Sequence, residues 1–361
     1  MFALAEILDV PPYSLESEEK GALYVRALSD LTGHHYAHCA PYARMLDGFG
    51  YRNGTVFSSM ADIPFIPLRL FKEYDLASVA KSEVVKTMTS SGTTGQKLSK
   101  IFLDRETSTN QTKVLTKLVA SFIGKKRLPM LVIDSREVIK DRNLFSARGA
   151  GILGFSMFGA DIEYALDAHM QLDLPKVQAF IDKHRGGPIL LFGFTFMIWE
   201  HFRSALRDAG VKLALDGGVL IHGGGWKKLS EQAVDREKFN QAIHEVSGIA
   251  RVHNYYGMVE QTGSIFMECE AGKLHASIFS DVLIRDHRNF SVLPHGQAGL
   301  IQLLSLLPTS YPGHSILSED VGRVLGEDDC PCGRKGKYFE IHGRIKNAEV
   351  RGCSDAYATA A

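Results

Sequence analysis

The most informative segment of the chain is Thr89-Ser90-Ser91-Gly92-Thr93-Thr94-Gly95-Gln96-Lys97, which combines hydroxyl side chains, glycines and a closing lysine. Glycines let backbone N–H groups turn toward an anion. Hydroxyls can donate to phosphate oxygens, and a lysine adds a positive charge that tolerates several phosphate poses. The Gly-x4-Gly-Lys-Ser/Thr spacing of nucleoside triphosphatases is missing. We therefore predict a phosphate-binding loop of another kind, made by Ser90, Ser91, Gly92, Thr93, Thr94, Gly95 and Lys97; a solvated Ser/Gly linker is the alternative.

Apolar segments around this loop predict an α/β fold. Strands are predicted at 84–89, 128–133, 189–194, 219–222 and 251–255, and helices at 18–31, 36–46 and 197–209. Strands that alternate with helices indicate a sheet with helices on its faces, and ligands bind beyond the carboxyl ends of such strands. Residues 1–80 should be mostly helical. Residues 281–326, with short β-branched runs between prolines, should form a smaller β-rich subdomain.

The composition excludes several classes of protein. The 361 residues are 45% hydrophobic and 23% charged, as expected for a soluble globular protein. Lys plus Arg and Asp plus Glu number 41 each, which gives no reason to expect a nucleic-acid partner. The N-terminus lacks the basic region of a signal peptide, and no apolar run reaches the ~18 residues of a membrane span. We expect a cytoplasmic protein, and its 5 cysteines are too sparse for a disulfide scaffold.

Further motifs follow predicted strands. The segment Tyr256-Gly257-Met258-Val259-Glu260 comes after the strand at 251–255, and His222-Gly223-Gly224-Gly225 follows the one at 219–222. A tyrosine ring offers a flat face to a purine, and Mg²⁺ prefers carboxylate oxygens. Glycines permit close backbone approach to a flat ligand. The alternatives are a tight turn with an ordinary surface glutamate and a plain flexible turn.

Taken in order, these motifs resemble those of the acyl-adenylate-forming superfamily. The resemblance implies that Tyr256 stacks near adenine, Glu260 helps hold Mg²⁺ and Gly224 lines the adenine pocket. It extends to Ser318-Glu319-Asp320-Val321-Gly322 and Gly343-Arg344-Ile345-Lys346, and implies that Asp320 binds the ribose and that Arg344 reaches the nucleotide at a hinge. In the loop, Lys97 stands where the superfamily has proline, so either Lys97 or Lys100 meets the phosphate. Val259 stands where threonine is usual.

Two segments point to one family within this superfamily: the loop sequence SSGTTG-x-K and residues 349–355 near the C-terminus. With them, the sequence resembles the LuxE family of acyl-protein synthetases, and the phenylacetate-CoA ligases are more distant relatives. The resemblance implies ATP-dependent activation of a fatty acid, an acyl thioester on Cys353, and delivery to an acyl reductase or another acyl-accepting protein. A thiolate is a strong nucleophile toward an acyl-adenylate.

The same resemblance implies the domain organisation. It predicts an adenylation domain at 1–343 and a hinge-like tail at 344–361, without the superfamily's C-terminal lid. The alternatives are an inert tail cysteine, an acyl- or aryl-CoA ligase of the phenylacetate type, and a non-catalytic nucleotide-binding subunit.

Two other groups of residues each allow two interpretations. Cys330-Pro331-Cys332 forms a tight knuckle, and Cys269 and His275 lie upstream at a Cys-x5-His spacing. A Cys₃His set suits structural Zn²⁺; reduced cysteines in a turn are the alternative. The aromatic residues are either walls of an acyl pocket or, more commonly, core: Phe192, Phe194, Phe196 and Trp199.

Overall fold

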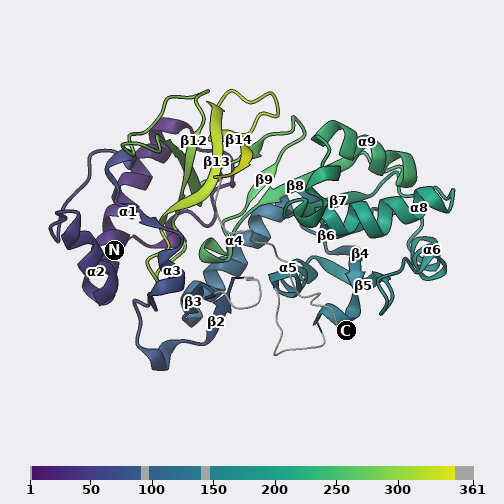
Figure 1. The fold of residues 1–361 in the computed structure, drawn as a ribbon, viewed down its shortest axis with the longest axis horizontal. Coiled ribbons are helices and arrows are strands. Elements are labelled where there is room, and N and C mark those ends of the chain that lie inside the picture. The colour runs from purple at the N-terminus through teal and green to yellow at the C-terminus, as the bar shows by residue number, and fades with distance from the viewer. Residues whose placement is uncertain (1, 91–96, 140–146, 346–361) are drawn as a thin grey trace. The chain divides into compact units, whose positions relative to one another are not determined.

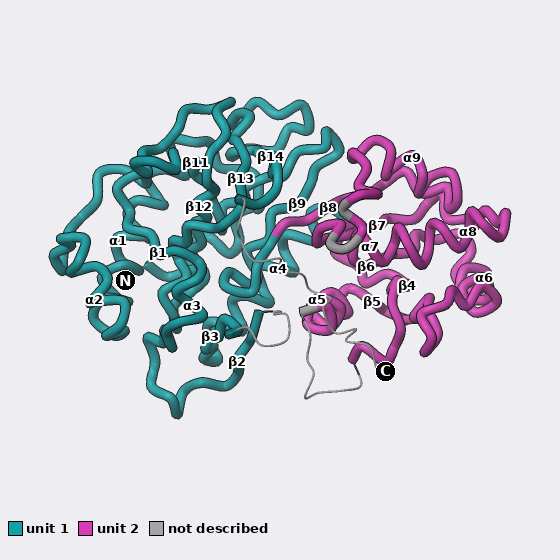
Figure 2. Tube along the Cα trace, viewed as in Figure 1, with its two compact units in different colours: residues 1–122, 257–349 teal, residues 123–256, 350–361 magenta. Residues whose placement is uncertain are grey.

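The computed structural model describes residues 2–90, 97–139 and 147–345 (Figure 1). The chain forms two compact units, residues 1–122 with 257–349 and residues 123–256 with 350–361 (Figure 2). The sequence predicts a domain boundary between residues 343 and 344, followed by a tail. Residues 346–361 of that tail lie outside the described residues, so the boundary stays a prediction.

Unit 2, residues 123–256 with 350–361, is built on a parallel sheet in the order β8-β7-β6-β4-β5. Its strands are β4 (Leu128–Ser135), β5 (Gly159–Leu166), β6 (Leu190–Phe194), β7 (Val219–Gly223) and β8 (Arg251–Tyr256). Strands β6 and β7 are buried along their whole length, which explains their continuous apolar runs. The strands predicted at 128–133, 189–194, 219–222 and 251–255 are confirmed.

The helices of unit 2 connect these strands. They are α5 (Ala147–Ser156), α6 (Leu174–Lys183), α7 (Thr195–Met197), a π-helical segment η5 (Ile198–Arg203), α8 (Ser204–Asp208) and α9 (Arg236–Ser247). The helix predicted at 197–209 is therefore confirmed as the continuous run α7-η5-α8. Helix α9 begins where Asp235 accepts a hydrogen bond from the Lys238 amide and ends at Gly248, whose φ of 74° suits the left-handed cap.

Unit 1, residues 1–122 with 257–349, joins a helical N-terminus to an antiparallel sheet. Its helices are α1 (Ser17–His38), α2 (Ala40–Gly48), α3 (Leu70–Glu73) and α4 (Arg105–Ile123). The sheet runs β11-β12-β13-β14-β10-β9, from β9 (Phe266–Glu268), β10 (Leu274–His275), β11 (Ser280–Arg285), β12 (Gly299–Ser305), β13 (Ser315–Glu327) and β14 (Lys337–Arg344). The predicted helical N-terminus and the β-rich segment 281–326 are both confirmed.

Smaller elements complete the two units. Strand β1 (Ile66–Pro67) pairs in parallel with β13, and β2 (Lys86–Thr89) pairs with β3 (Lys100–Leu103) in a separate two-stranded sheet. Short 3₁₀ helices lie at η1 (Leu4–Glu6), η2 (Met60–Asp62), η3 (Lys81–Glu83), η4 (Arg136–Ile139), η6 (Lys227–Gln232) and η7 (Val259–Gln261). Among the described residues no helix is long and apolar enough to cross a membrane. The expected cytoplasmic location stays a prediction.

A buried ion network fastens α1 to the sheet of unit 1. The Asp281 carboxylate lies 2.9 Å from both the Lys20 and the Lys337 ammonium groups. Lys20 also donates to the Ser280 carbonyl at 3.0 Å. Burial acts to raise the pKa of Asp281, but the two lysines hold that pKa down at about 2. Removing one partner of such a buried network leaves an uncompensated charge, so these residues fix the position of α1.

Candidate functional site

The predicted phosphate loop joins the two strands of a hairpin. Thr89 of β2 faces Lys100 of β3, and the Ser90 amide donates to the Ser99 carbonyl at 3.1 Å. The Ser90 hydroxyl in turn accepts from the Ser99 amide at 3.0 Å, so this side chain closes the hairpin. The rest of the predicted loop lies outside the described residues: Ser91, Gly92, Thr93, Thr94 and Gly95.

Both candidate lysines make surface ion pairs; Lys97 lies just before β3, and Lys100 is the first residue of β3. The Lys97 ammonium is 3.1 Å from Glu73, and the Lys100 ammonium is 3.3 Å from Asp75. All four side chains are well exposed. Exposed pairs of this kind contribute about 0–1 kcal/mol, so either lysine can leave its partner for a phosphate. The structure does not choose between them.

The aromatic–glutamate motif spans the end of β8 and the turn η7. Tyr256 is half-buried, whereas the Glu260 and Gln261 side chains are each only 2% exposed. Met258 and Val259 pack against an apolar cluster that includes Tyr311 and Ile316. Gly257 lies close to Ile265, since an added Cβ would come within 3.0 Å of its Cγ2 atom.

The glycine run of unit 2 is held against aromatic rings. The Thr195 hydroxyl lies 2.9 Å from both His222 Nδ1 and the Gly224 carbonyl oxygen. Burial lowers the pKa of His222 to about 3, so its ring is neutral. A Cβ on Gly223 would lie 2.4 Å from the Tyr255 ring, and Gly224 has a φ of 75°. Gly223 is thus required by close approach and Gly224 by its backbone conformation, whereas nothing lies within 4 Å of a Cβ added at Gly225.

The aromatic residues of β6 belong to the core of unit 2. Phe192 is 0% exposed and Phe194 2%. The Phe155 ring stacks on Phe192 at 4.2 Å and lies 5.2 Å from the Tyr255 ring. The Trp199 ring lies over Phe239 at 5.9 Å. The core interpretation of these aromatics therefore fits their packing.

Asp320 and Arg344 face each other across β13 and β14. They occupy paired positions in the sheet register, and Arg344 Nε donates to Asp320 Oδ1 at 3.3 Å. The Ile345 amide donates to the Glu319 carbonyl at 3.1 Å, which continues the pairing past the strand end. Sequence reasoning proposed both residues for nucleotide binding, and the structure brings the two together. A guanidinium so placed orients the carboxylate.

Four candidate zinc ligands gather at one end of the unit 1 sheet. Cys269 follows β9, His275 lies in β10, and Cys330 and Cys332 lie in the turn between β13 and β14. Their ligand atoms all lie within 4.8 Å of one another. The Cys269 and Cys330 sulfurs are 3.9 Å apart, and Cys332 Sγ is 3.4 Å from His275 Nε2. Tetrahedral Zn²⁺ with Zn–S bonds of ~2.3 Å places two sulfurs about 3.8 Å apart, so the donor set fits.

The neutral imidazole of His275 suits a metal ligand. Burial lowers the pKa of His275 to about 4, which keeps its ring neutral. Burial also raises the pKa of the Cys330 thiol to about 12, so this thiol would lose its proton only on binding a metal. Burial would likewise raise the pKa of Cys332, but hydrogen bonds from Arg334 lower it. Cys332 is the partly exposed member and lines a hollow of about 460 Å³ with Tyr13 and Arg334.

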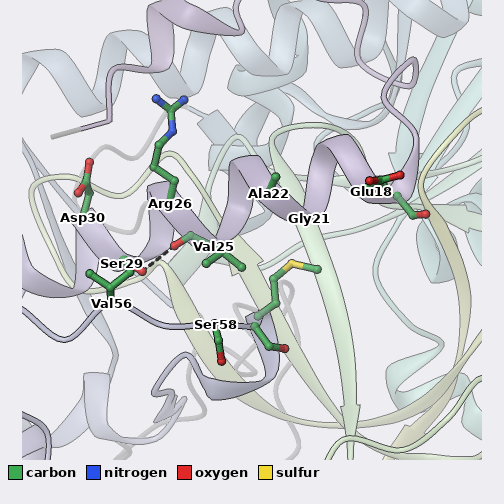
Figure 3. Close-up of a pocket in the computed structure, with 12 residues that line it drawn as sticks. Glu18, Gly21, Ala22, Val25, Arg26, Ser29, Asp30, Val56 and Ser58 are labelled. Carbon is green, nitrogen blue, oxygen red and sulfur yellow. Dashed lines mark hydrogen bonds between the residues drawn. The ribbon is translucent and has the colours of Figure 1, made fainter.

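A larger hollow of unit 1 lies away from the motif residues. It measures about 640 Å³ and runs along α1 (Figure 3). Gly21, Ala22 and Val25 of α1 face Val56 and Met60 across it. None of the predicted site residues lines this hollow.

Comparison with solved structures defines the class of fold. The chain matches an open conformation of 2-hydroxyisobutyryl-CoA ligase in complex with 2-HIB-AMP and CoA, with a TM-score of 0.72 and 17% identity over 93% of this chain and 77% of that one. It also matches that ligase in its postadenylation state, with a TM-score of 0.70 and 16% identity over 92% and 69%. The two units therefore have the fold of an adenylate-forming enzyme, as predicted.

Comparison of sequences defines the family. The family model LuxE, acyl-protein synthetase, matches residues 3–361, and the chain belongs to this family of ligases. The Vibrio harveyi long-chain-fatty-acid–luciferin-component ligase is 26% identical over 359 residues, covering 95% of this chain and 89% of that protein. The Aliivibrio fischeri protein of the same name is 24% identical over 329 residues, covering 84% and 82%. The predicted resemblance is confirmed.

Sequence reasoning missed the groups that hold these motifs in place. The Thr195 hydroxyl contacts the Gly223 and Gly224 carbonyls, which lie 28 and 29 positions away in the sequence. The Tyr311 hydroxyl donates to the Glu260 carbonyl, 51 positions away. Each acts on a backbone carbonyl, which every residue carries. No residue pattern in one sequence marks such a contact.

Proposed function

We propose that the chain activates a long-chain fatty acid with ATP and transfers the acyl group to its own Cys353. The family match over residues 3–361 carries this proposal, together with the names of the two Vibrio-type relatives. The buried Glu260 carboxylate and the paired Asp320 and Arg344 supply polar groups of the kind that a nucleotide requires. Cys353 lies outside the described residues.

The first step forms the acyl-adenylate. A carboxylate oxygen of the fatty acid attacks the α-phosphorus of ATP, and the bond to pyrophosphate breaks. The loop Ser90–Lys97 hydrogen-bonds the phosphate oxygens, Tyr256 stacks on adenine, and Asp320 accepts from the ribose hydroxyls. Gly224, with Gly257, lets the backbone approach the base. Arg344 pairs with the polyphosphate; Glu260 would hold Mg²⁺, which would neutralise negative charge on the phosphates.

The second step forms the thioester. The Cys353 sulfur attacks the carbonyl carbon of the adenylate, the bond to the AMP oxygen breaks, and the thiol proton passes to solvent. The thioester then serves an acyl reductase or another acyl-accepting protein as donor. Zn²⁺ at Cys269, His275, Cys330 and Cys332 is proposed as structural, because four protein ligands leave no open coordination position.

Intact mass spectrometry tests this function directly. The protein is incubated with ATP, Mg²⁺ and tetradecanoic acid, without coenzyme A, and then treated with hydroxylamine. We expect one hydroxylamine-sensitive acyl adduct, present in the Cys39→Ala control and missing in Cys353→Ser. Acyl-CoA formation on addition of coenzyme A, with no protein adduct, would instead identify a CoA ligase. No AMP formation with any acid would leave only a nucleotide-binding subunit.

A further inference from the structure

Two side chains hold the turn that carries Glu260 through hydrogen bonds to main-chain carbonyl oxygens. Tyr311 donates from its hydroxyl to the Glu260 carbonyl oxygen at 2.9 Å. The Gln261 side-chain amide donates to the Leu303 carbonyl at 3.1 Å and to the Gly313 carbonyl at 2.8 Å. Both N–H bonds of this amide are therefore used, and both tie the turn to the β12–β13 region, whose strands lie side by side in Figure 1.

The packing around these contacts is close. Tyr311 is 0% exposed and its ring lies edge-on to Phe71 at 6.3 Å. A Cβ on Gly313 would come within 2.3 Å of the Tyr311 ring and 2.8 Å of the Glu260 carbonyl oxygen. At the other end of the turn, Gly263 has a φ of 89°, and a Cβ there would lie 2.8 Å from the Gln111 backbone. Glycine is needed at both positions because the backbone segments touch.

These contacts matter because the turn carries the Glu260 carboxylate, the proposed Mg²⁺ ligand. Glu260 is 2% exposed, and the same residue gives its carbonyl to Tyr311 and its carboxylate to the proposed Mg²⁺. Mg²⁺ demands near-octahedral oxygen geometry at ~2.0–2.1 Å and tolerates little displacement of a ligand. A change of the order of 1 Å in a catalytic group can lower a rate by about 10²-fold. A turn fixed through its backbone therefore fixes the point from which the Glu260 side chain extends toward the proposed Mg²⁺.

We propose that Tyr311 and Gln261 are positioning residues that set the Glu260 carboxylate for Mg²⁺. Neither touches the nucleotide in this scheme; both act through the backbone of the turn. The inference rests on the proposed function, since it assigns them to the adenylation step. Their loss should appear as a raised Mg²⁺ requirement, because a displaced carboxylate binds the cation less well.

The experiment measures ATP–pyrophosphate exchange with a fatty acid across a series of Mg²⁺ concentrations. Tyr311→Phe removes one hydroxyl and keeps the ring. We expect the Mg²⁺ concentration for half-maximal exchange to rise about fivefold, the effect of losing one buried hydrogen bond, with exchange restored at high Mg²⁺. Gln261→Met should raise it further, since two hydrogen bonds are lost. Tyr36→Phe is the matched control, because the Tyr36 hydroxyl donates only to the exposed Asp47 carboxylate.

Different results separate the possible failures. If wild-type protein shows no exchange with any acid, the proposed function fails, and calorimetric titration of ATP with and without Mg²⁺ then tests the positioning role by itself. If Tyr311→Phe lowers the melting temperature while its Mg²⁺ curve, or its Mg²⁺-dependent ATP affinity, coincides with that of Tyr36→Phe, Tyr311 is a packing residue only and the inference is overturned. A shifted curve at unchanged melting temperature supports it.

Discussion

Different kinds of interaction hold the two ends of the β13–β14 region: a Cys/His cluster at one end and side-chain hydrogen bonds to main-chain carbonyls near the other. At one end, Cys269, His275, Cys330 and Cys332 gather four ligand atoms within 4.8 Å. Near the other, the Glu260 turn is held by Tyr311 and Gln261 through carbonyl oxygens. The first arrangement depends on rare side chains and is proposed to stabilise the fold through a metal. The second depends on ordinary hydrogen bonds and is proposed to place one carboxylate. Substitutions in the cluster should therefore lower stability, whereas substitutions of Tyr311 or Gln261 should change the Mg²⁺ dependence of adenylation.

Loss of the cluster should have the largest effect on stability. We expect Cys330→Ser, or exhaustive chelation of the wild type, to lower the free energy of unfolding by about 4 kcal/mol or more, since metal binding contributes directly to folding. The measurements are thermal unfolding and zinc content of the purified protein. Cys39→Ser, at a buried cysteine outside the cluster, should keep one zinc per chain. A metal-free wild type with the same melting temperature would refute a structural metal.

The Lys20–Asp281–Lys337 network is a second fastening made by side chains. We expect Lys20→Met to cost about 3 kcal/mol, because it leaves a buried carboxylate with one cation. The folded-state pKa of Asp281, about 2, is below its ordinary value of 3.8. The stability it contributes is therefore present above pH 4 and lost as the pH falls toward 2, about 2 kcal/mol in total.

Denaturant unfolding between pH 2 and pH 6 measures this dependence. Asp281→Asn should be less stable at pH 6 and should lose less stability on acidification than the wild type. Lys335→Met is the matched control, since Lys335 pairs with Glu16 at the surface and 34% of its side chain is exposed. An equal acid dependence in Asp281→Asn and wild type would show that the network does not set it.

A smaller effect is expected where a hydroxyl holds the glycine run. Thr195→Val removes the contacts to His222 and to the Gly223 and Gly224 carbonyls, while keeping shape and burial. We predict a KM for ATP raised about fivefold and a loss of stability of about 1 kcal/mol. Thr195→Ser, which retains the hydroxyl, should behave as wild type. If valine and serine variants share the wild-type KM, the glycine run does not bind the nucleotide.

The contrast between the two regions also explains what could be predicted from the sequence. The parallel strands of unit 2 were visible because buried strands read as apolar runs, as Leu190–Phe194 does. The gathering of Cys269, His275, Cys330 and Cys332 could be predicted because cysteines are scarce and their spacing is informative; zinc at this cluster stays a prediction. Tyr311, Gln261 and Thr195 were not, because their partners are main-chain oxygens far away in sequence. The division into two units was also missed, since unit 1 closes only when residues 257–349 return to the N-terminal segment.

The chain is proposed to form an acyl-adenylate with Glu260 at the reacting phosphates. Fatty-acid-dependent ATP–pyrophosphate exchange tests it most directly, because it reports adenylation without requiring an acyl acceptor. We predict exchange by the wild type, retained exchange by Cys353→Ser, and a loss of at least about 10²-fold in Glu260→Gln, as for removal of an electrostatic group at a reacting centre. Wild-type exchange in Glu260→Gln, or none in the wild type with any carboxylic acid, would contradict the account.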